Sequence, residues 1–326
     1  MDVTGEQHEL RATVRRFLAE KAGDSLLWRQ MADQLGLQGV ALPEKYGGAG
    51  AGLTELAIVM EELGRVLLPS PYFATVALAG HALAECGDEA KSRWLPAIVD
   101  GSLTATVAFS GADVRACGGE LTGTAMFVVD GDTADLLLVV AGADLYAVEG
   151  KSVRRTRLQT LDPTRRLGRL ELDRTPAVRL DANVDRVRDL AVIALAAEQV
   201  GGARACLDAA VGYAKVRVQF GRPIGSFQAI KHKCADLLLE VEAARSAVEH
   251  AAATTGDDLP IAAALAAAYC SVVYTRVAKE NIQIHGGIGY TWEHDAHRHL
   301  KRAKSSELLF GTPATHRARL ADLVGI

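Results

Sequence analysis

The chain has 326 residues, 49% hydrophobic and 23% charged, so it is long enough for two or three domains with buried cores and is not a disordered protein. Its 36 Lys and Arg residues against 40 Asp and Glu give a formal net charge of -4. This balance argues against a dedicated nucleic-acid-binding protein, which usually carries a basic excess, but it leaves room for a local basic pocket that binds a phosphorylated ligand.

The cysteines favour neither a disulfide framework nor a zinc site. Their number is odd and none forms a Cys-x-x-Cys pair, which is typical of a reducing compartment: Cys86, Cys117, Cys206, Cys234 and Cys270. The N-terminal segment is charged throughout, which predicts no signal peptide and a cytoplasmic protein. The longest uncharged stretch, residues 259–275, is Ala-rich and short, which favours a buried core helix over a membrane span.

The first hundred residues have helical periodicity. Apolar residues at helical spacing predict helices over residues 5–22, 28–36, 53–66, 72–85 and 88–99. Pro43 and four glycines interrupt this pattern in LPEKYGGAGAG, residues 42–52, which predicts a loop. We therefore expect an N-terminal helical domain over residues 1–102.

The hydrophobic period changes near residue 103. Short runs rich in β-branched residues and closed by Gly or Asp predict strands within residues 103–111, 123–131, 134–142, 144–150, 167–173 and 176–180. Turn residues separate these runs at intervals typical of a small antiparallel sandwich or barrel. We expect a reduced middle β domain over residues 103–184.

Long helical patterns return after residue 185. They predict helices over residues 186–217, 227–253, 261–287 and 295–308. These four helices predict a C-terminal four-helix bundle over residues 185–326. The expected fold class is α+β, mainly α, in the order helical domain, β domain, helical bundle.

A glycine- and proline-containing turn separates the first two of these long helices. The segment RVQFGRPIGSFQ, residues 217–228, presents Arg217 and Gln228 around one apolar residue, Phe220. Arginine suits bidentate phosphate binding. Spacing alone fits a helix–helix connection with solvated arginines equally well.

A second glycine-rich segment, QIHGGIGY, covers residues 283–290 at the end of a predicted helix. Three glycines in four positions free backbone N–H groups and let another chain or a ligand approach closely. A helix C-cap alone needs only one glycine. The segment does not follow a predicted strand, which argues against a Rossmann fold.

The two segments together, within this domain order, resemble the acyl-CoA dehydrogenase family. R-x-Q-F-G-x-x-I-x-x-F-Q is followed by Q-x-x-G-G-x-G-Y, the likeness covers nearly the whole chain, and LPEKYGGAG resembles the family's N-terminal loop. The resemblance implies an enzyme that binds FAD, converts an acyl-CoA to the 2,3-enoyl-CoA and passes electrons to an electron-transfer flavoprotein.

The resemblance also implies residues that contact FAD. Arg217 and Phe220 match positions that contact the FAD diphosphate and adenosine, and Gln228 matches a further contact. Contacts made to FAD from across a subunit interface are matched by Gln283, Gly286 and Gly287. An arginine and free backbone amides suit a pyrophosphate.

The family's catalytic carboxylate is absent from its usual place. Much of the family carries a Glu in a Y-E-G-T segment, where it removes the acyl α-proton. The matching residues here are 309–312, and Phe310 stands at the Glu position. Phenylalanine cannot accept a proton, so we expect no catalytic base there.

Three other carboxylates are candidates for a relocated base. Some relatives carry the base on the helix that begins near Phe227, and Asp257 and Asp258 lie close to the expected place, although they also suit a turn and a helix N-cap. Glu293 is another candidate acid. The histidines beside it lack metal-site spacing, so we expect no metal.

The middle domain departs from the family as well. Phe127-Val128-Val129 replaces a Trp-containing segment, and the strand TATVAFSG lacks the usual Thr-Glu-Pro. We therefore expect that this chain does not hold the isoalloxazine ring itself. The FAD contacts offered to a neighbouring subunit are intact, whereas the chain's own flavin pocket and base are missing.

This division resembles the acyl-CoA dehydrogenases of actinobacterial steroid degradation, which are α2β2 heterotetramers. The resemblance implies a homologous catalytic subunit as partner and a bulky substrate such as a steroid-derived CoA thioester. Two alternatives stay open. One is a self-sufficient homo-oligomer that uses Asp257, Asp258 or Glu293 as its base, and the other is a helical scaffold that kept the fold without the chemistry.

Overall fold

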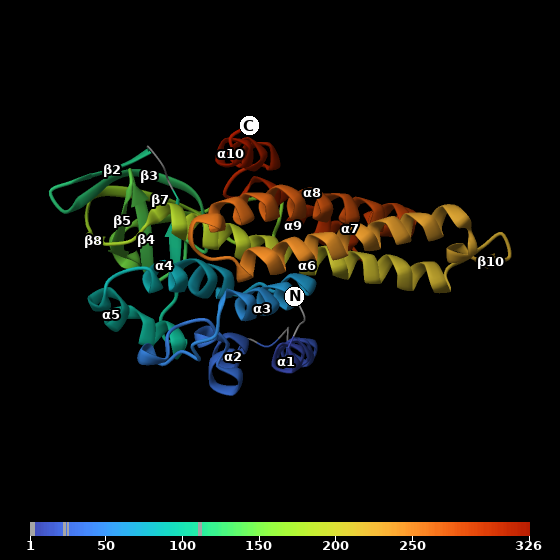
Figure 1. Ribbon diagram of the computed structural model, residues 1–326, viewed down its shortest axis with the longest axis horizontal. Helices are drawn as coiled ribbons and strands as arrows, with labels where there is room; N and C mark the ends of the chain where they lie inside the picture. Colours follow the sequence, from blue (N-terminus) through green and yellow to red (C-terminus); the bar gives the residue numbers. More distant parts are fainter. Residues whose placement is uncertain (1–3, 22–23, 25, 110–112) are drawn as a thin grey trace. The chain divides into compact units, whose positions relative to one another are not determined.

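The computed structural model describes residues 4–21, 24, 26–109 and 113–326, and Figure 1 shows its elements. The chain divides into two compact units, each built from segments that are far apart in sequence. One unit contains the N-terminal segment through Glu20, Ala57–Leu68 and Val192–Ile326. The other contains Lys21–Leu56 and Pro69–Ala191.

Every predicted helix is present, which confirms a mainly helical α+β fold. The helices are α1 Gly5–Lys21, α2 Leu27–Leu35, α3 Leu53–Arg65, a π-helical segment Phe73–Gly80 continuing into α4 His81–Ala84, α5 Asp88–Val99, α6 Val184–Val216, α7 Gln228–Ala253, α8 Leu259–His285, α9 Ala296–Leu308 and α10 Pro313–Val324. The last helix, α10, was not predicted.

The middle region forms two four-stranded sheets that share one apolar core. The strands are β1 Ala105–Ala108, β2 Val114–Cys117, β3 Glu120–Val129, β4 Leu136–Ala141, β5 Asp144–Glu149, β6 Arg154–Arg157, β7 Leu167–Pro176 and β8 Val178–Leu180. Their orders are β1-β4-β5-β8 and β2-β3-β7-β6. Leu121, Leu137, Val139 and Leu170 are among the core residues contributed by both sheets, as a sandwich requires.

The sheets correct the predicted strand pattern in two respects. The pairing is not purely antiparallel, because β1 runs parallel to β4, with Ala105 opposite Leu136; the intervening chain contributes its hairpin to the other sheet. The strands β2 and β6 were missed. The last residues of the predicted strand 103–111, Ser110 and Gly111, lie outside the described residues.

The C-terminal helices form the predicted bundle. Figure 1 shows α6, α7 and α8 lying along one another, and α9 and α10 pack on α8. Gly202 of α6 leaves space for Tyr274 of α8, since a Cβ at residue 202 would lie 2.4 Å from the Tyr274 ring. A Cβ at Gly201 would lie 1.8 Å from the Glu61 carbonyl oxygen of α3, so α3 packs on α6 backbone to backbone.

Ion pairs hold further elements to this bundle. Arg15 of α1 pairs with Glu62 of α3 at 2.7 Å, and Arg245 of α7 pairs with Glu61 at 2.7 Å. Inside the bundle, Arg302 pairs with Glu198 at 2.7 Å, with side chains only 4% and 6% exposed. A buried pair of this kind fixes the arrangement of α6 and α9, because either charge alone would be strongly unfavourable there.

Two segments have the length and composition of membrane-crossing helices, Val184–Val216 and Gly256–Tyr290. Their most apolar windows are 89% and 72% buried inside the protein. Burial of this extent is typical of core helices. The expectation of a buried core helix over residues 259–275 is therefore confirmed.

Candidate functional site

The segment between α6 and α7 is a short hairpin that projects from the end of the bundle (Figure 1). Strands β9, Val218–Gln219, and β10, Arg222–Pro223, pair antiparallel. The two residues between them, Phe220 and Gly221, have φ of 53° and 77°, as in a type I′ turn. Phe220 is 93% exposed at the tip. Its ring makes an edge contact with Phe227, with the ring centres 6.1 Å apart, and the rest of the ring is open to a contact from outside this chain.

Contacts within the segment shape the hairpin around Arg217. The guanidinium of Arg222 lies 4.1 Å from the ring centre of Phe227, and the Ile224 N–H donates to the Arg217 carbonyl oxygen at 2.8 Å. The Arg217 side chain itself is exposed. Within the described part of the chain its guanidinium has no ion pair, so it is available to an anion from outside.

The glycine-rich turn begins where α8 ends. Gly286 has φ 66° and ψ -141°, a conformation almost restricted to glycine. Gly289 packs closely, since a Cβ there would lie 3.0 Å from the Ile282 carbonyl oxygen. Gly287 differs from both: it lacks a left-handed φ, and a Cβ would meet nothing within 4 Å. The backbone at residue 287 is therefore open to approach from outside, and nothing within the chain requires glycine there.

The structure brings the two predicted segments together at one end of the bundle. A buried cluster of Ala210, Ala214 and Ile284 joins α6 to α8, and Ile224 and Ile230 pack on it from the hairpin side. Tyr213 extends this contact through its backbone, since its carbonyl oxygen accepts the Arg217 N–H at 2.9 Å. The remaining predicted contacts, Gln228 at the start of α7 and Gln283 near the end of α8, are both exposed at this end.

Sequence reasoning missed a ring stack behind these two segments. His285 is 6% exposed and lies between Tyr213 and His294, with ring centres 4.4 Å and 4.3 Å away. Its Nδ1 lies 2.8 Å from the Asn281 carbonyl oxygen. Burial and the neighbouring His294 hold the pKa of His285 below its usual value. A histidine directly before Gly-Gly at a helix end was the available signal.

Phe310 lies in the connection between α9 and α10. It is half-buried and has φ 64°. The following Thr312 caps α10 by accepting the Thr315 N–H at 3.2 Å. The segment that matches Y-E-G-T in the family therefore connects α9 to α10. The side chain at its Glu position, Phe310, is apolar.

The other candidate carboxylates are all exposed. Asp257 and Asp258 lie in the turn that precedes α8, and Asp258 occupies the N-cap position without a side-chain cap bond. Because α8 has 27 residues and a helix rises 1.5 Å per residue, about 40 Å separates these aspartates from Gly286. Glu293 lies instead in the turn after the glycine-rich segment.

Metal and disulfide chemistry find no support in the described residues. They contain no group of three or more His, Cys, Asp or Glu side chains that could hold a metal ion. His299 is engaged with the Tyr274 hydroxyl at 3.1 Å. The five cysteines are free.

Phe127 lies in the segment that replaces the family's Trp-containing one. It sits in an irregularity of β3, between the pairings of Ala125 and Val128, with φ 58°. Its side chain is 58% exposed. The irregularity therefore turns the Phe127 ring outward and interrupts the alternation of inward and outward side chains that a regular strand would have.

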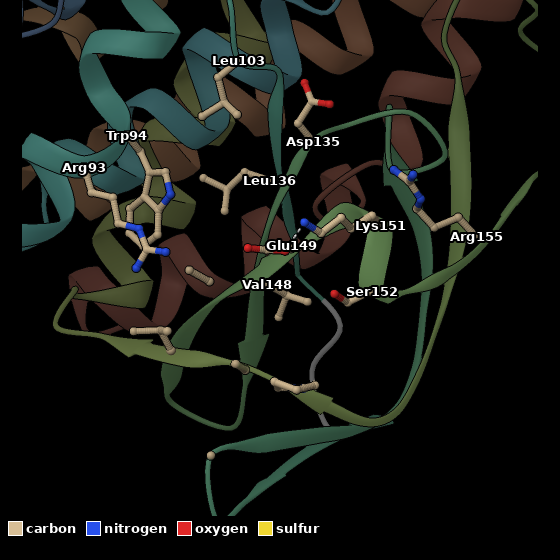
Figure 2. A pocket seen from close by; sticks show the side chains of 15 residues that line it. Arg93, Trp94, Leu103, Asp135, Leu136, Val148, Glu149, Lys151, Ser152 and Arg155 are labelled. Carbon is tan, nitrogen blue, oxygen red and sulfur yellow. Dashed lines mark ion pairs between the residues drawn. The ribbon is translucent and has the colours of Figure 1, made fainter.

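A groove of about 760 Å³ lies in the other unit (Figure 2). Trp94 and Arg93 of α5 form one side, and Lys151 and Arg155 lie on the other. Much of its charge is already satisfied, since Lys151 pairs with Glu149 at 3.0 Å. None of the sequence-predicted site residues lines this groove.

Comparison with known proteins agrees with the fold and the segment order. Residues 4–102 match the acyl-CoA dehydrogenase N-terminal domain, and residues 189–324 match the acyl-CoA dehydrogenase C-terminal domain. The acyl-CoA dehydrogenase IpdE2 of Mycobacterium tuberculosis is 40% identical over 98% of this chain and 93% of its own length.

Two solved structures are similar over nearly their full length. The ChsE4-ChsE5 complex of Mycobacterium tuberculosis superposes with a TM-score of 0.92 at 30% identity, over 100% of this chain and 99% of that one. The steroid ACAD Tcur3481-Tcur3483 gives a TM-score of 0.91 at 33% identity, over 99% of each chain. The chain belongs to the acyl-CoA dehydrogenase family.

Proposed function

We propose that this chain is one subunit of a two-chain, α2β2 acyl-CoA dehydrogenase, in which it completes the FAD site of a homologous catalytic partner. The observation that carries the proposal is Phe310 at the position of the family's base, combined with an intact and exposed set of FAD contacts at the bundle end. A chain that functioned alone would need a base of its own in that place.

The residues at the bundle end fit FAD. Arg217 is exposed and unpaired in the described part of the chain, and a guanidinium is suited to a diphosphate. The open backbone at Gly287 leaves space that a Cβ would fill. Gly286, Gln283 and Gln228 add exposed amide groups at the same end.

Each group has a distinct role in this proposal. When bound, FAD would supply the acceptor for the β-hydride of the acyl-CoA. Arg217 would pair with the cofactor's diphosphate, the amides of the glycine-rich turn would donate hydrogen bonds to it, and Phe220 would pack against its adenosine. The partner provides the contacts of the flavin ring and the carboxylate that removes the α-proton.

The proposed substrate is a bulky acyl-CoA, such as a steroid-derived CoA thioester. Support comes from the similarity to Tcur3481-Tcur3483, which is described as a steroid ACAD, and from the two-chain ChsE4-ChsE5 complex. In the proposed pair of chains the partner has a catalytic base and this chain has Phe310 at the corresponding position. This difference is consistent with one active centre per pair of chains. An electron-transfer flavoprotein as electron acceptor and a cytoplasmic location complete the proposal.

The flavin-to-protein ratio tests this division of labour. The chain is purified alone and with a homologous acyl-CoA dehydrogenase chain, encoded by an adjacent gene, that retains the Glu of the Y-E-G-T segment. We expect little flavin alone, and one FAD per pair of chains with acyl-CoA turnover in the complex.

Two results would contradict the proposal. Stoichiometric flavin and turnover in the chain alone would favour a homo-oligomer with Asp257, Asp258 or Glu293 as its base. A chain that forms no complex with the homologue and retains no FAD would favour the scaffold.

A further inference from the structure

The His285 ring lies between α6, which leads into the Arg217 hairpin, and the turn that follows the glycine-rich segment. On one side its ring stacks on Tyr213 with 27° between the planes, and the Tyr213 carbonyl oxygen holds the Arg217 N–H. On the other side it contacts His294, which follows the glycine-rich turn. Gly289 folds back onto the same residue, since a Cβ there would lie 3.1 Å from the His285 Cβ.

We infer, resting on the proposed function, that His285 is a positioning residue: its ring, fixed by Asn281, Tyr213 and His294, sets the placement of the Arg217 hairpin relative to the Gly286–Tyr290 turn and thereby the affinity for FAD. It need not touch the cofactor to do so. The hairpin is linked to the ring through Tyr213, and the glycine-rich turn begins at the next residue, Gly286, so a change at residue 285 is expected to alter both FAD contacts together.

The hydrogen bonds of His285 and His294 define the protonation state in which the His285 ring holds the two segments. The Asn281 carbonyl oxygen only accepts, so His285 Nδ1 carries a proton and donates to it at 2.8 Å. His294 Nδ1 accepts the Ala296 N–H at 3.1 Å, so that nitrogen is unprotonated. A neutral His285 satisfies both the hydrogen bond and the stack.

Protonation of His285 opposes this arrangement. The groups that face the ring are Tyr213 from α6, His294 from the turn before α9, and the Asn281 carbonyl of its own helix. Within the described part of the chain no carboxylate forms an ion pair with it. Because burial and His294 lower the pKa of His285, the neutral form is favoured in the folded state, and the stabilisation is lost as pH falls below the ordinary value of about 6.5.

Two substitutions at residue 285 distinguish the effect of the stacked ring from the effect of its hydrogen bond. His285→Asn keeps a donor but removes the stack, and we expect the Kd for FAD of the two-chain complex to rise at least tenfold at pH 8. His285→Phe keeps a ring of similar size and cannot be protonated. We expect its Kd at pH 8 to stay within about threefold of wild type, as a rescue of the lost stack.

The pH profile distinguishes positioning from a merely structural role. FAD binding is titrated in the complex from pH 8 to pH 5.5 by flavin fluorescence. We expect wild type and the exposed control His250→Phe to weaken together as pH falls, whereas His285→Phe weakens less over this range. If His285→Asn fails to fold, this comparison alone decides.

Three outcomes overturn the inference. An unchanged Kd in folded His285→Asn contradicts the stack's role, and a wild-type pH profile in His285→Phe contradicts the role of its neutral form. Absence of FAD from the wild-type complex overturns the proposed function as well, whereas normal wild-type binding with either of the first two results overturns only the positioning role.

Discussion

The open backbone at Gly287 gives the sharpest test of an FAD contact made outside this chain. Replacing Gly287 with Ala adds a methyl group where nothing lies within 4 Å and where φ is not left-handed. Such a Gly→Ala change removes freedom from the unfolded chain, and we expect it to raise the free energy of unfolding of the chain alone by about 0.4–1 kcal/mol.

The same methyl group is expected to weaken FAD binding in the two-chain complex. In the proposed site it would occupy space next to the turn's amides, where the diphosphate is expected to bind. Loss of one hydrogen bond to a charged group weakens binding by about 1.5–3 kcal/mol, which corresponds to about a ten- to 150-fold increase in Kd. Gly287→Ala is therefore predicted to be neutral or stabilising for the chain and harmful for the cofactor.

Two matched glycines serve as controls. Gly286→Ala places a side chain at φ 66° and ψ -141°, so it should destabilise the chain itself by about 1–3 kcal/mol. Gly212→Ala, in open space on α6, should stabilise the chain by up to about 1 kcal/mol without changing FAD affinity. Urea unfolding measures stability and flavin fluorescence titration measures Kd. An unchanged Kd in Gly287→Ala would refute the assigned contact.

Four further substitutions test other parts of the structure. Arg217→Ala should remove most FAD from the complex while leaving the urea midpoint of the chain unchanged, and retained flavin would count against its role. Phe220→Gly relieves a left-handed aromatic residue but loses the edge contact with Phe227, so it should change the stability of the chain alone by less than about 1 kcal/mol while lowering FAD retention in the complex. Arg302→Met removes the buried Arg302–Glu198 ion pair and should lower the free energy of unfolding by about 3–5 kcal/mol in urea titrations. Burial lowers the pKa of His81 to about 4, so stability should fall by about 3 kcal/mol as pH drops from about 6.5 to 4, and His81→Leu should flatten this profile.

The proposed assembly explains why exposed and unfavourable features gather at one end of the bundle. Phe220 is nearly fully exposed with a left-handed φ, Arg217 lacks a partner in the described part of the chain, and Gly287 faces open space. Within the chain, the Phe220 ring makes an edge contact with Phe227, but Arg217 and Gly287 gain nothing from their exposure. In the proposed assembly, each of these exposed features would become favourable when a cofactor held by a neighbouring subunit packs against it.

Regular elements were predictable because their hydrophobic period is local. Helical spacing identified α6, α7 and α8 nearly to their ends, and β-branched runs identified β4 and β5. The strands β2 and β6 escaped prediction because they are short and mostly exposed, as edge strands often are, and β6 is largely basic. The parallel pairing of β1 with β4 could not be read from either strand alone, since partner choice depends on the path of the chain between them.

The sequence by itself determined the residue types of the candidate site, including a phenylalanine at position 310. R-x-Q-F-G, G-G-x-G and Phe310 are chemical identities that need no coordinates, because a guanidinium binds anions and a phenyl ring takes no proton wherever they lie. It also determined the order of helices and strands, since their periods are local properties.

Only the tertiary structure decided which of these residues act together. The cluster of Ala210, Ala214 and Ile284 brings the hairpin and the glycine-rich turn to one end of the bundle. Asp257 and Asp258 lie just before the start of α8, so the length of this helix separates them from that end. It also placed His285 between Tyr213 and His294, and it distinguished Gly287, which nothing in the chain requires, from Gly286, which the backbone requires. These are consequences of packing between distant segments, which no local pattern contains.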